Sequence, residues 1–263
     1  MSAALTLAPP VSRRLKSLAA ILIILALWEV AARLFVPGVN PIIPPPSVLA
    51  TYVARHAALL LISVQPTIVA AISGFCIGAS ISIVLAVIFV RFPTVEAALA
   101  NSVVLLHALP MLAIIPLLVI WFGIGYTPKI IIAALATFFP VLNGALRGLR
   151  SSDRSTLELM HILDAHWLQT LTKVKIPFAL PYIFAGLKIA APQAVLGATV
   201  AEWIGSRSGL GSQILIALLN YDVPLLWACM VACALLAATG FCLILLIEYL
   251  VIGRRSEPLR EED

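Results

Sequence analysis

The sequence predicts an all-α polytopic membrane protein with about six transmembrane helices. Hydrophobic residues make up 62% of the chain, charged residues make up only 11%, and the mean hydropathy is +1.09. A soluble domain would carry about 25% charged residues. The apolar runs are continuous and lack the alternation of apolar and polar residues that marks the strands of a membrane β-barrel. Strands of that kind are therefore excluded.

The candidate spans follow from the length of the apolar runs. A spanning helix needs about 20 predominantly apolar residues, and the chain supplies six candidates. They cover residues 18–35, 67–90, 103–123, 130–146, 182–200 and 225–252. We therefore expect one transmembrane domain over residues 18–252, between tails at residues 1–17 and 253–263.

Arginine and lysine residues set the expected orientation. Arg13, Arg14 and Lys16 precede the first run, which is too long for a signal peptide and lacks a clear cleavage site. If six spans alternate, twelve Arg and Lys residues lie on the inner side and four on the outer side, in agreement with the positive-inside rule. We expect a multi-pass membrane protein with both termini in the cytoplasm. The net charge of +5 then reflects orientation in the lipid bilayer, and no nucleic-acid partner is expected.

The sequence contains no pattern for a catalytic or metal site. Cys229 and Cys233 are one helical turn apart, but no His or carboxylate with ligand spacing accompanies them. We expect these cysteines to pack as small apolar residues. The phosphate-binding pattern G-x-x-x-x-G-K-[ST] does not occur, so we expect no cofactor bound by this chain.

Prolines and small residues predict local structure in the first half of the transmembrane domain. Residues 44–46 are three successive prolines, which form a stiff extended link. Ser47 can then cap a short helix that runs through Ala58. Gly74 and Gly78 in the second span permit close contact with another helix.

The third and fourth spans contain proline breaks. Pro110 and Pro116 interrupt the third span, and Pro140 interrupts the fourth. Breaks at membrane depth are tolerated where protein or a water-filled cavity satisfies the freed carbonyl groups. We therefore expect the third to fifth spans to line a pore and the first span to be peripheral. His107 lies one turn before Pro110. The sequence leaves two interpretations of it open, a solute-binding residue and a hydrogen bond to a neighbouring helix.

The candidate solute pathway combines residues near these breaks with polar residues of the later spans. Glu202, at the outer end of the fifth span, is the clear intramembrane charge, and a hydrogen bond between subunits is its alternative role. Ion-coupled carriers usually place ionisable groups near the midplane, and no inverted repeat is visible. Both observations count against a secondary transporter. The pathway candidates are His107, Pro110, Met111, Asn143, Gln193 and Glu202.

A polar, cationic loop at residues 150–177 separates the fourth and fifth spans. Ser155 and Glu158 have capping-box spacing, so we expect a helix to begin there. Apolar residues then recur every three or four positions, as one stripe of an amphipathic helix. Such a helix lies on lipid headgroups, packs on its own bundle or docks into a partner. The stripe comprises Leu157, Met160, Leu163 (or Asp164), Trp167 and Leu171. Prolines at 177 and 181 are expected to end the loop, and Pro181 to begin the next span.

The spacing in this loop resembles the EAA loop of binding-protein-dependent ABC importer permeases. Glu158 stands at the position of the glutamate, Leu159-Met160 at the two alanines, Asp164 at the glycine and Ile176-Pro177 at the final L-P pair. In that family the loop is the coupling helix, which inserts into a groove on the ATPase subunit. The resemblance implies ATPase-coupling roles for Glu158, Met160, Leu163, Asp164, Ala165, Trp167, Leu171 and Pro177.

Other segments are similar to the permeases for nitrate, taurine and aliphatic sulfonates. These segments are ALWEVAAR at 26–33, IPLLVIWFGIG at 115–125, PVLN at 140–143, AEWIG at 201–205 and SGLG at 208–211. The resemblance implies a type I ABC importer permease fold, a homodimer of permease copies and a location in a bacterial inner membrane. It also implies two ATPase subunits that bind ATP and Mg, and an extracytoplasmic solute-binding protein.

The same resemblance implies a small solute as cargo. A sulfonate-, taurine- or nitrate-like solute is favoured, with a pyrimidine-type vitamin precursor or riboflavin as the alternative. An ion-coupled secondary transporter is a distant alternative.

Two departures from the family pattern concern the loop. Asp164 replaces a glycine, and because Asp tolerates unusual backbone angles and caps helices well, we expect it to cap a second helix that begins at Ala165. Leu159 and Met160 replace small alanines, which implies a wider groove on the partner. We therefore hypothesise that this permease is matched to its own ATPase.

Overall fold

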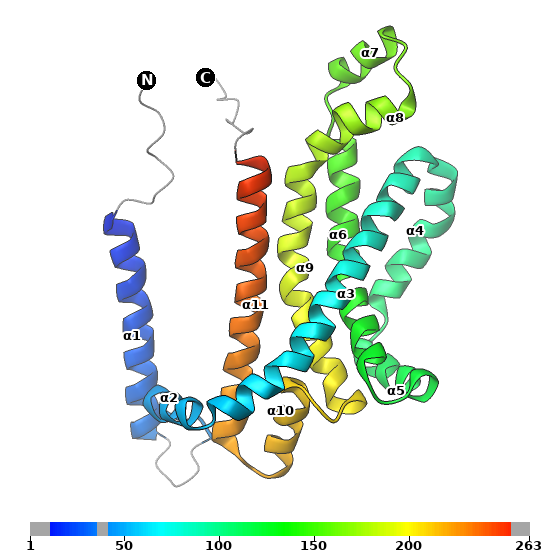
Figure 1. Cartoon of the computed structure of the whole chain (residues 1–263). Coiled ribbons are helices and arrows are strands. Elements are labelled where there is room, and N and C mark those ends of the chain that lie inside the picture. Colours follow the sequence, from blue (N-terminus) through cyan, green and yellow to red (C-terminus); the bar gives the residue numbers. More distant parts are fainter. Residues whose placement is uncertain (1–10, 36–41, 254–263) are drawn as a thin grey trace.

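The computed structural model describes residues 11–35 and 42–253, and every regular element in these ranges is helical. The predicted all-α class is confirmed. The elements in chain order (Figure 1) are α1 (Val11–Phe35), α2 (Pro46–Arg55), α3 (Ala57–Arg91), α4 (Pro93–Ala108), α5 (Met111–Phe122), α6 (Tyr126–Arg150), α7 (Arg154–Ile162), α8 (Trp167–Thr170), the π-helical turn η1 (Leu171–Lys175), α9 (Ile176–Gly205), α10 (Leu210–Leu219) and α11 (Val223–Ile252).

Long apolar helices run between two ends of the molecule, one of which carries α7 and α8 (Figure 1). Within the described residues, four helices are long and apolar enough to cross a membrane, or five if the bent pair α4 and α5 counts as one span. Helix α1 covers the predicted first span. The tails at 1–10 and 254–263 lie outside the described residues. Val11 already lies in α1, so the helix begins before the predicted boundary at residue 18.

The predicted third span, 103–123, is not a single helix. Helix α4 begins at Pro93, and α5 follows at an angle of 94°. The bend lies at Leu109 and Pro110, because a residue before proline avoids the helical region and proline has no N–H to continue the ladder. Leu109 is accordingly extended, with φ −65° and ψ 131°. Pro116 lies inside α5 without ending it.

The predicted break at Pro140 is wrong. Helix α6 continues through Pro140, and α9 continues through Pro181 and Pro192. Membrane helices tolerate proline where neighbouring groups satisfy the local backbone. Buried Ser82 on α3 donates a hydrogen bond to the carbonyl of Phe138, 2.8 Å away in the turn before Pro140. This bond ties α6 to α3 next to the proline, although the carbonyl that Pro140 leaves without its helical donor is that of Ala136.

Short helices connect the spans at the end opposite α7. Helix α2 begins at Pro46 with Pro45 as its N-cap, so the predicted cap by Ser47 is wrong, and the helix ends at Arg55. Ser47 instead donates to Glu29 of α1 through its N–H (3.0 Å) and its hydroxyl (2.7 Å). The sequence did not predict α10.

Helix α2 is also tied to α11 by a tyrosine and an aspartate. The Tyr52 hydroxyl donates to Asp222 Oδ2 at 3.2 Å, and Asp222 Oδ1 accepts from the N–H of Leu225 in the first turn of α11. Burial, followed by the nearby Asp222 carboxylate, raises the pKa of Tyr52 to about 12. The phenol therefore stays protonated and keeps donating at physiological pH.

Helix α6 lies between α3 and α9 at backbone contact. A Cβ atom added at Gly78 of α3 would overlap the carbonyl of Ala134, and one added at Gly144 of α6 would lie 2.6 Å from the carbonyl of Tyr182. The predicted role of Gly74 and Gly78 in close helix contact is confirmed. We refer to α3, α6 and α9 together as the central helices.

The first prediction concerns this close packing. Gly144→Ala should lower the free energy of unfolding by about 1–3 kcal/mol, because the new methyl group meets backbone that cannot rotate away. Gly240→Ala is the matched control, because its Cβ would have its nearest neighbour at 3.6 Å. Thermal unfolding in detergent checks both variants. Equal melting temperatures for the two would contradict the packing described.

Candidate functional site

The α7–α8 hairpin, residues 151–170, extends beyond the ends of α3 and α4 (Figure 1). No residue of α7 is buried. Four apolar side chains are more than half exposed, and we call them the exposed ridge. They are Leu159 (54%), Ile162 (79%), Leu163 (65%) and Leu168 (62%). Exposed apolar side chains clustered on a projecting element mark a surface that another molecule covers.

Helix α7 begins two residues earlier than the predicted capping box requires. Asp153 is the N-cap residue in extended conformation, and the Ser155 hydroxyl donates to the Asp153 carboxylate. Glu158 faces solvent and pairs with Arg154 at 3.2 Å. The predicted Ser155–Glu158 capping box is therefore wrong.

The turn between α7 and α8 depends on Asp164, whose φ of 48° lies in the left-handed region. The N–H of Asp164 donates to the carbonyl of His161 and the N–H of Ala165 to that of Met160, both at 3.0 Å. This pair of bonds is the Schellman arrangement that ends many helices, and its left-handed position normally holds glycine. Asp164 thus fills the place of the glycine and preserves the turn, as predicted.

Asp164 does not cap the second helix. Helix α8 begins at Trp167, and His166 is its N-cap residue. The N–H of His166 donates to Gln169 Oε1 at 3.0 Å. The predicted start at Ala165 is wrong, because Ala165 N–H is used to close the preceding helix.

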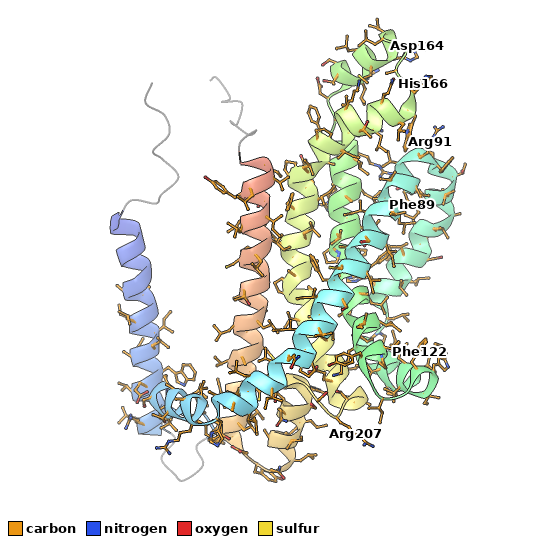
Figure 2. All side chains as sticks on the ribbon, in the orientation of Figure 1. Phe89, Arg91, Phe122, Asp164, His166 and Arg207 are labelled. Atoms are coloured by element: carbon orange, nitrogen blue, oxygen red, sulfur yellow. The ribbon has the colours of Figure 1, made fainter. Side chains whose placement is uncertain are left out.

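Two residues of the predicted apolar stripe face the bundle. Leu171 is buried beside Ala86 and Leu149, and Trp167 is partly buried against the same cluster. The Arg91 guanidinium lies 5.2 Å from the centre of the Trp167 ring, within cation–π distance. Figure 2 shows Arg91 at the end of α3, below the hairpin that carries Asp164 and His166.

The single continuous stripe is therefore wrong, because the left-handed turn changes the helical register. The ridge faces outward, while Trp167 and Leu171 anchor the hairpin. Of the other candidates in this loop, Met160 and Ala165 are half-buried and Pro177 is exposed in the first turn of α9.

The hairpin is continuous with α9. Helix α8 passes through the π-helical turn Leu171–Lys175 directly into Ile176, without the predicted break at Pro177. On its other side the hairpin follows the end of α6 at Arg150. A displacement of the hairpin therefore acts on two central helices at once.

Three of the pathway candidates lie together. His107 stacks on Phe139 with ring centres 4.0 Å apart and planes inclined by 7°. Met111, next to Pro110, lines the same hollow of about 10 Å³, which is roughly the size that admits one water molecule.

The two amide candidates lie apart from each other. Asn143 is half-buried on α6, and Gln193 is exposed on α9. Close contacts of Gly144 with Tyr182 and of Gly197 with Ile132 fix the antiparallel register of these helices. That register separates the two amides by roughly 10–15 Å along the helix axes.

Glu202 lies inside the molecule, away from the other pathway candidates. Its side chain is fully buried and bonds within this chain, to Lys129 Nζ at 3.3 Å, Thr67 Oγ1 at 3.0 Å and the N–H of Gly211 at 2.8 Å. The predicted placement of Lys129 in an outer segment is also wrong, since it lies in the first turns of α6. The sequence offered no signal for this pair, because its members are 73 positions apart.

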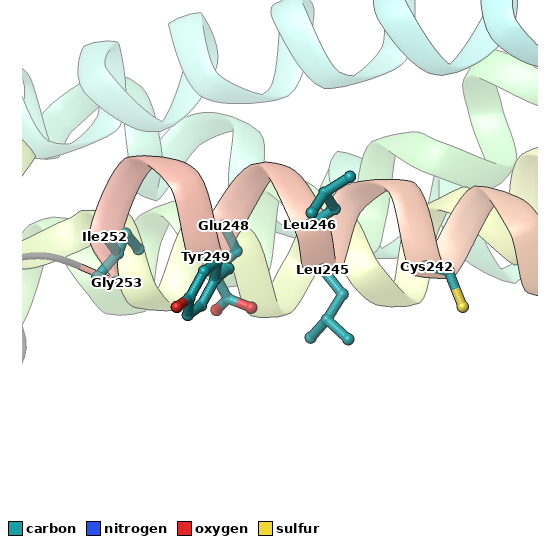
Figure 3. A pocket seen from close by; sticks show the side chains of 7 residues that line it. All are labelled: Cys242, Leu245, Leu246, Glu248, Tyr249, Ile252 and Gly253. Atoms are coloured by element: carbon teal, nitrogen blue, oxygen red, sulfur yellow. The ribbon is translucent and has the colours of Figure 1, made fainter. Parts of the chain in front are cut away.

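A second ion pair lies within the spans. Lys188, predicted at a helix entrance, lies well inside α9 and pairs with Glu248 of α11 at 2.7 Å. The expectation that Glu202 is the one clear intramembrane charge is therefore wrong. Glu248 and Tyr249 also line a hollow of about 570 Å³ along one face of α11. Figure 3 shows that its lining residues come from that one helix and do not all lie on the same side of it.

Known proteins resemble this chain over most of its length. The family model described as "Binding-protein-dependent transport system inner membrane component" matches residues 78–257. A riboflavin transport system permease protein of Chloroflexus aurantiacus is 33% identical over 80% of this chain and 80% of its own length. A formylaminopyrimidine transport permease protein of Halalkalibacterium halodurans is 30% identical over 90% and 94%. A putative aliphatic sulfonates transport permease protein of Bacillus subtilis is 32% identical over 73% and 70%.

The second prediction tests the turn. Asp164→Gly should keep the hairpin folded or stabilise it, because glycine adopts a φ of 48° without steric strain. Asp164→Val should destabilise it by about 1–2 kcal/mol, because a Cβ clashes in the left-handed region and a β-branched residue fits there least. Hydrogen–deuterium exchange of residues 154–170 measures both effects. Equal exchange in the two variants would contradict the left-handed turn.

Proposed function

The chain belongs to the family of binding-protein-dependent transport system inner membrane components, and we propose that it is the permease subunit of an ATP-driven importer for a small solute. The observation that carries the proposal is the exposed ridge on a hairpin that joins two central helices. The family explains why a membrane protein presents such a ridge: a transport permease needs a contact surface for its energy source.

The exposed ridge is the proposed docking surface for a cytoplasmic ATPase. Ile162 and Leu163 lie beside the left-handed turn and are its most exposed apolar side chains. Arg154 and Glu158 at the base of α7 are solvated and pair with each other, so they stay polar at the rim of a contact. Aliphatic side chains at the centre with charged residues around them are the usual composition of a protein interface.

The proposed assembly holds two copies of this chain, two ATPase subunits that bind ATP and Mg, and an extracytoplasmic solute-binding protein. The start of α1 and the end of α11 lie at the same end as the hairpin (Figure 1). The arginine and lysine distribution favours cytoplasmic termini. Because the hairpin lies at the same end of the molecule, we place it in the cytoplasm as well.

The proposed mechanism uses the continuity of the hairpin with the central helices. Closure of the ATPase dimer on ATP would draw the two hairpins together and change the tilt of α6 and α9, which opens the pathway outward to accept solute. ATP hydrolysis would reset this change. A ligand shifts such an equilibrium only through a difference in its contacts with the two states. Trp167 and Leu171 would transmit the displacement, because they fix the hairpin to the bundle.

The third prediction concerns the ridge. Ile162→Asp should weaken binding of the ATPase by at least about tenfold, because a charge replaces the most exposed apolar side chain of the proposed interface. Tyr221→Asp is the matched control: Tyr221 is 82% exposed near the opposite end and has a φ of 54°, which Asp tolerates. Co-purification of the ATPase with each variant is the measurement. Undiminished binding by Ile162→Asp would remove the ridge from the interface.

The cargo is proposed on two grounds. The sequence resemblance favours a sulfonate-, taurine- or nitrate-like solute, as does the named sulfonate permease. The geometry favours a second candidate, a neutral heteroaromatic solute of the pyrimidine or riboflavin type. Lys129 and Lys188 are both paired with carboxylates, while the His107–Phe139 stack offers aromatic faces. Relatives named for riboflavin and formylaminopyrimidine agree with that candidate.

The fourth prediction separates an ATP-driven importer from an ion-coupled carrier. Vesicles that hold this chain with its ATPase and binding protein should accumulate solute when ATP is present inside them. Uptake should persist when ionophores collapse the ion gradients, because ATP is the proposed energy source. Uptake that needs a gradient and proceeds without ATP would support the carrier. Offering an alkanesulfonate, a formylaminopyrimidine and riboflavin in turn identifies the class of cargo.

A further inference from the structure

A closed polar cluster lies in the interior at the end opposite the hairpin. Its charged members, Glu202 and Lys129, have side chains that are 0% and 2% exposed. We call it the Glu202 cluster, and it consists of Thr67, Lys129, Glu202 and the backbone of residues 208–211. Proteins rarely bury charges so completely unless the charges are paired and hydrogen-bonded.

The Glu202 cluster joins several helices. Thr67 of α3 donates its hydroxyl proton to Glu202 and accepts from the N–H of Leu210 at 2.9 Å. Lys129 of α6 donates to the carbonyl of Ser208 at 2.8 Å. The Glu202 carboxylate of α9 accepts from the N–H of Gly211 at 2.8 Å, at the N-terminus of α10, where the helix dipole favours a negative charge. The connection between α9 and α10 is thus held by α3, α6 and α9 together.

Steric fit shows that the cluster is closed. Gly209 has a φ of 119°, and a Cβ atom there would overlap the Glu202 carboxylate. The carboxylate is therefore covered by backbone on one side and held by Lys129 and Thr67 on the others. No room is left for a solute beside it, so its role differs from that of a binding site.

The two helices that carry the hairpin are the ones that meet again in this cluster. Helix α6 has Lys129 in its first turns and reaches the hairpin at Arg150, while α9 leaves the hairpin at Ile176 and has Glu202 in its last turn. A helix of the length of α6 spans about 38 Å. The ion pair therefore connects α6 and α9 at one end, and the hairpin connects the same two helices at the other end.

We infer that Lys129 and Glu202 are positioning residues for transport. They fix the α9–α10 connection to α3 and α6, so that a displacement of the hairpin moves the opposite end of the central helices as one body. Without the pair, the far end no longer follows the hairpin, and ATP is hydrolysed without transport. The inference rests on the proposed importer function.

The chain provides a matched control in Lys188 and Glu248. This pair also joins α9 to another helix, but its side chains are 23% and 21% exposed, and its partner helix is α11. Removing one member of a fully buried pair leaves an uncompensated charge, whereas a partly exposed partner can be solvated. The two pairs therefore separate the effect of position from the general effect of losing an ion pair.

The test uses the reconstituted complex of this chain, its ATPase and its binding protein. The measurement is the ratio of solute transported to ATP hydrolysed. The amount of assembled complex is measured alongside it for each variant. Glu202→Gln and Lys129→Met should each lower this ratio by about tenfold, within the range of coupling changes that single substitutions produce. The double variant should assemble normally, because no buried charge is left unpaired, but it should keep the low ratio, because the link between α6 and α9 is still missing. Lys188→Met combined with Glu248→Gln should leave the ratio unchanged.

Thr67→Val keeps both charges but removes the hydroxyl that joins Glu202 to Leu210. This variant provides a second test if the charge variants do not assemble. It should lower the ratio by about threefold, the value of one hydrogen bond. Variants that lower only the amount of complex and leave the ratio intact would overturn the inference, because they indicate a purely structural role. Absence of ATP-dependent uptake by the unmodified complex would instead contradict the proposed function.

Discussion

Backbone contact between α6 and its two neighbours is the constraint on which the rest of the structure depends. In lipid there is little hydrophobic force between helices, so close packing and hydrogen bonds hold them together. Gly78 and Gly144 let α3 and α9 approach α6 at distances that a Cβ would forbid. This packing makes the central helices one unit. Both functional features, the hairpin and the Glu202 cluster, are attached to that unit at opposite ends.

The hairpin divides its apolar residues between two tasks because of one backbone angle. At Asp164 the chain enters the left-handed region and leaves the register of α7. Ile162, before the turn, stays in solvent, whereas Trp167 and Leu171, after it, reach the bundle. The result is an exposed apolar surface on one side and a packed attachment to the bundle on the other. A hairpin without the anchors would present the same ridge but would pass little of its movement to α9.

Much of the fold could be predicted from the sequence, because lipid allows few alternatives to apolar helices. The third span was misplaced, since α4 starts at Pro93, and the break expected at Pro140 is absent. Whether a proline ends a membrane helix depends on the helices packed around it, which no local pattern reveals. The partner of Glu202 was missed for a related reason. Lys129 lies 73 positions away, and only the packing of α6 on α9 brings the two together.

The sequence predicted where the candidate site lies, but not which way its side chains face. Loop spacing placed the hairpin correctly between two spans, and it identified Asp164 as the residue in place of glycine. It assigned one stripe to residues that face in different directions, because periodicity assumes an uninterrupted helix. The left-handed turn was the missing information. A position that holds glycine in a related pattern is the signal that could have indicated it.

The central claim is that the exposed ridge becomes covered by an ATPase. The most direct measurement is the reactivity of Ile162→Cys toward a membrane-impermeant maleimide, with and without the partner ATPase. Ile162 is 79% exposed in this structure, so labelling of the free permease should be fast. The account predicts strong protection when the ATPase is added, with no change for Tyr221→Cys near the opposite end. Equal labelling of Ile162→Cys with and without the ATPase would contradict it.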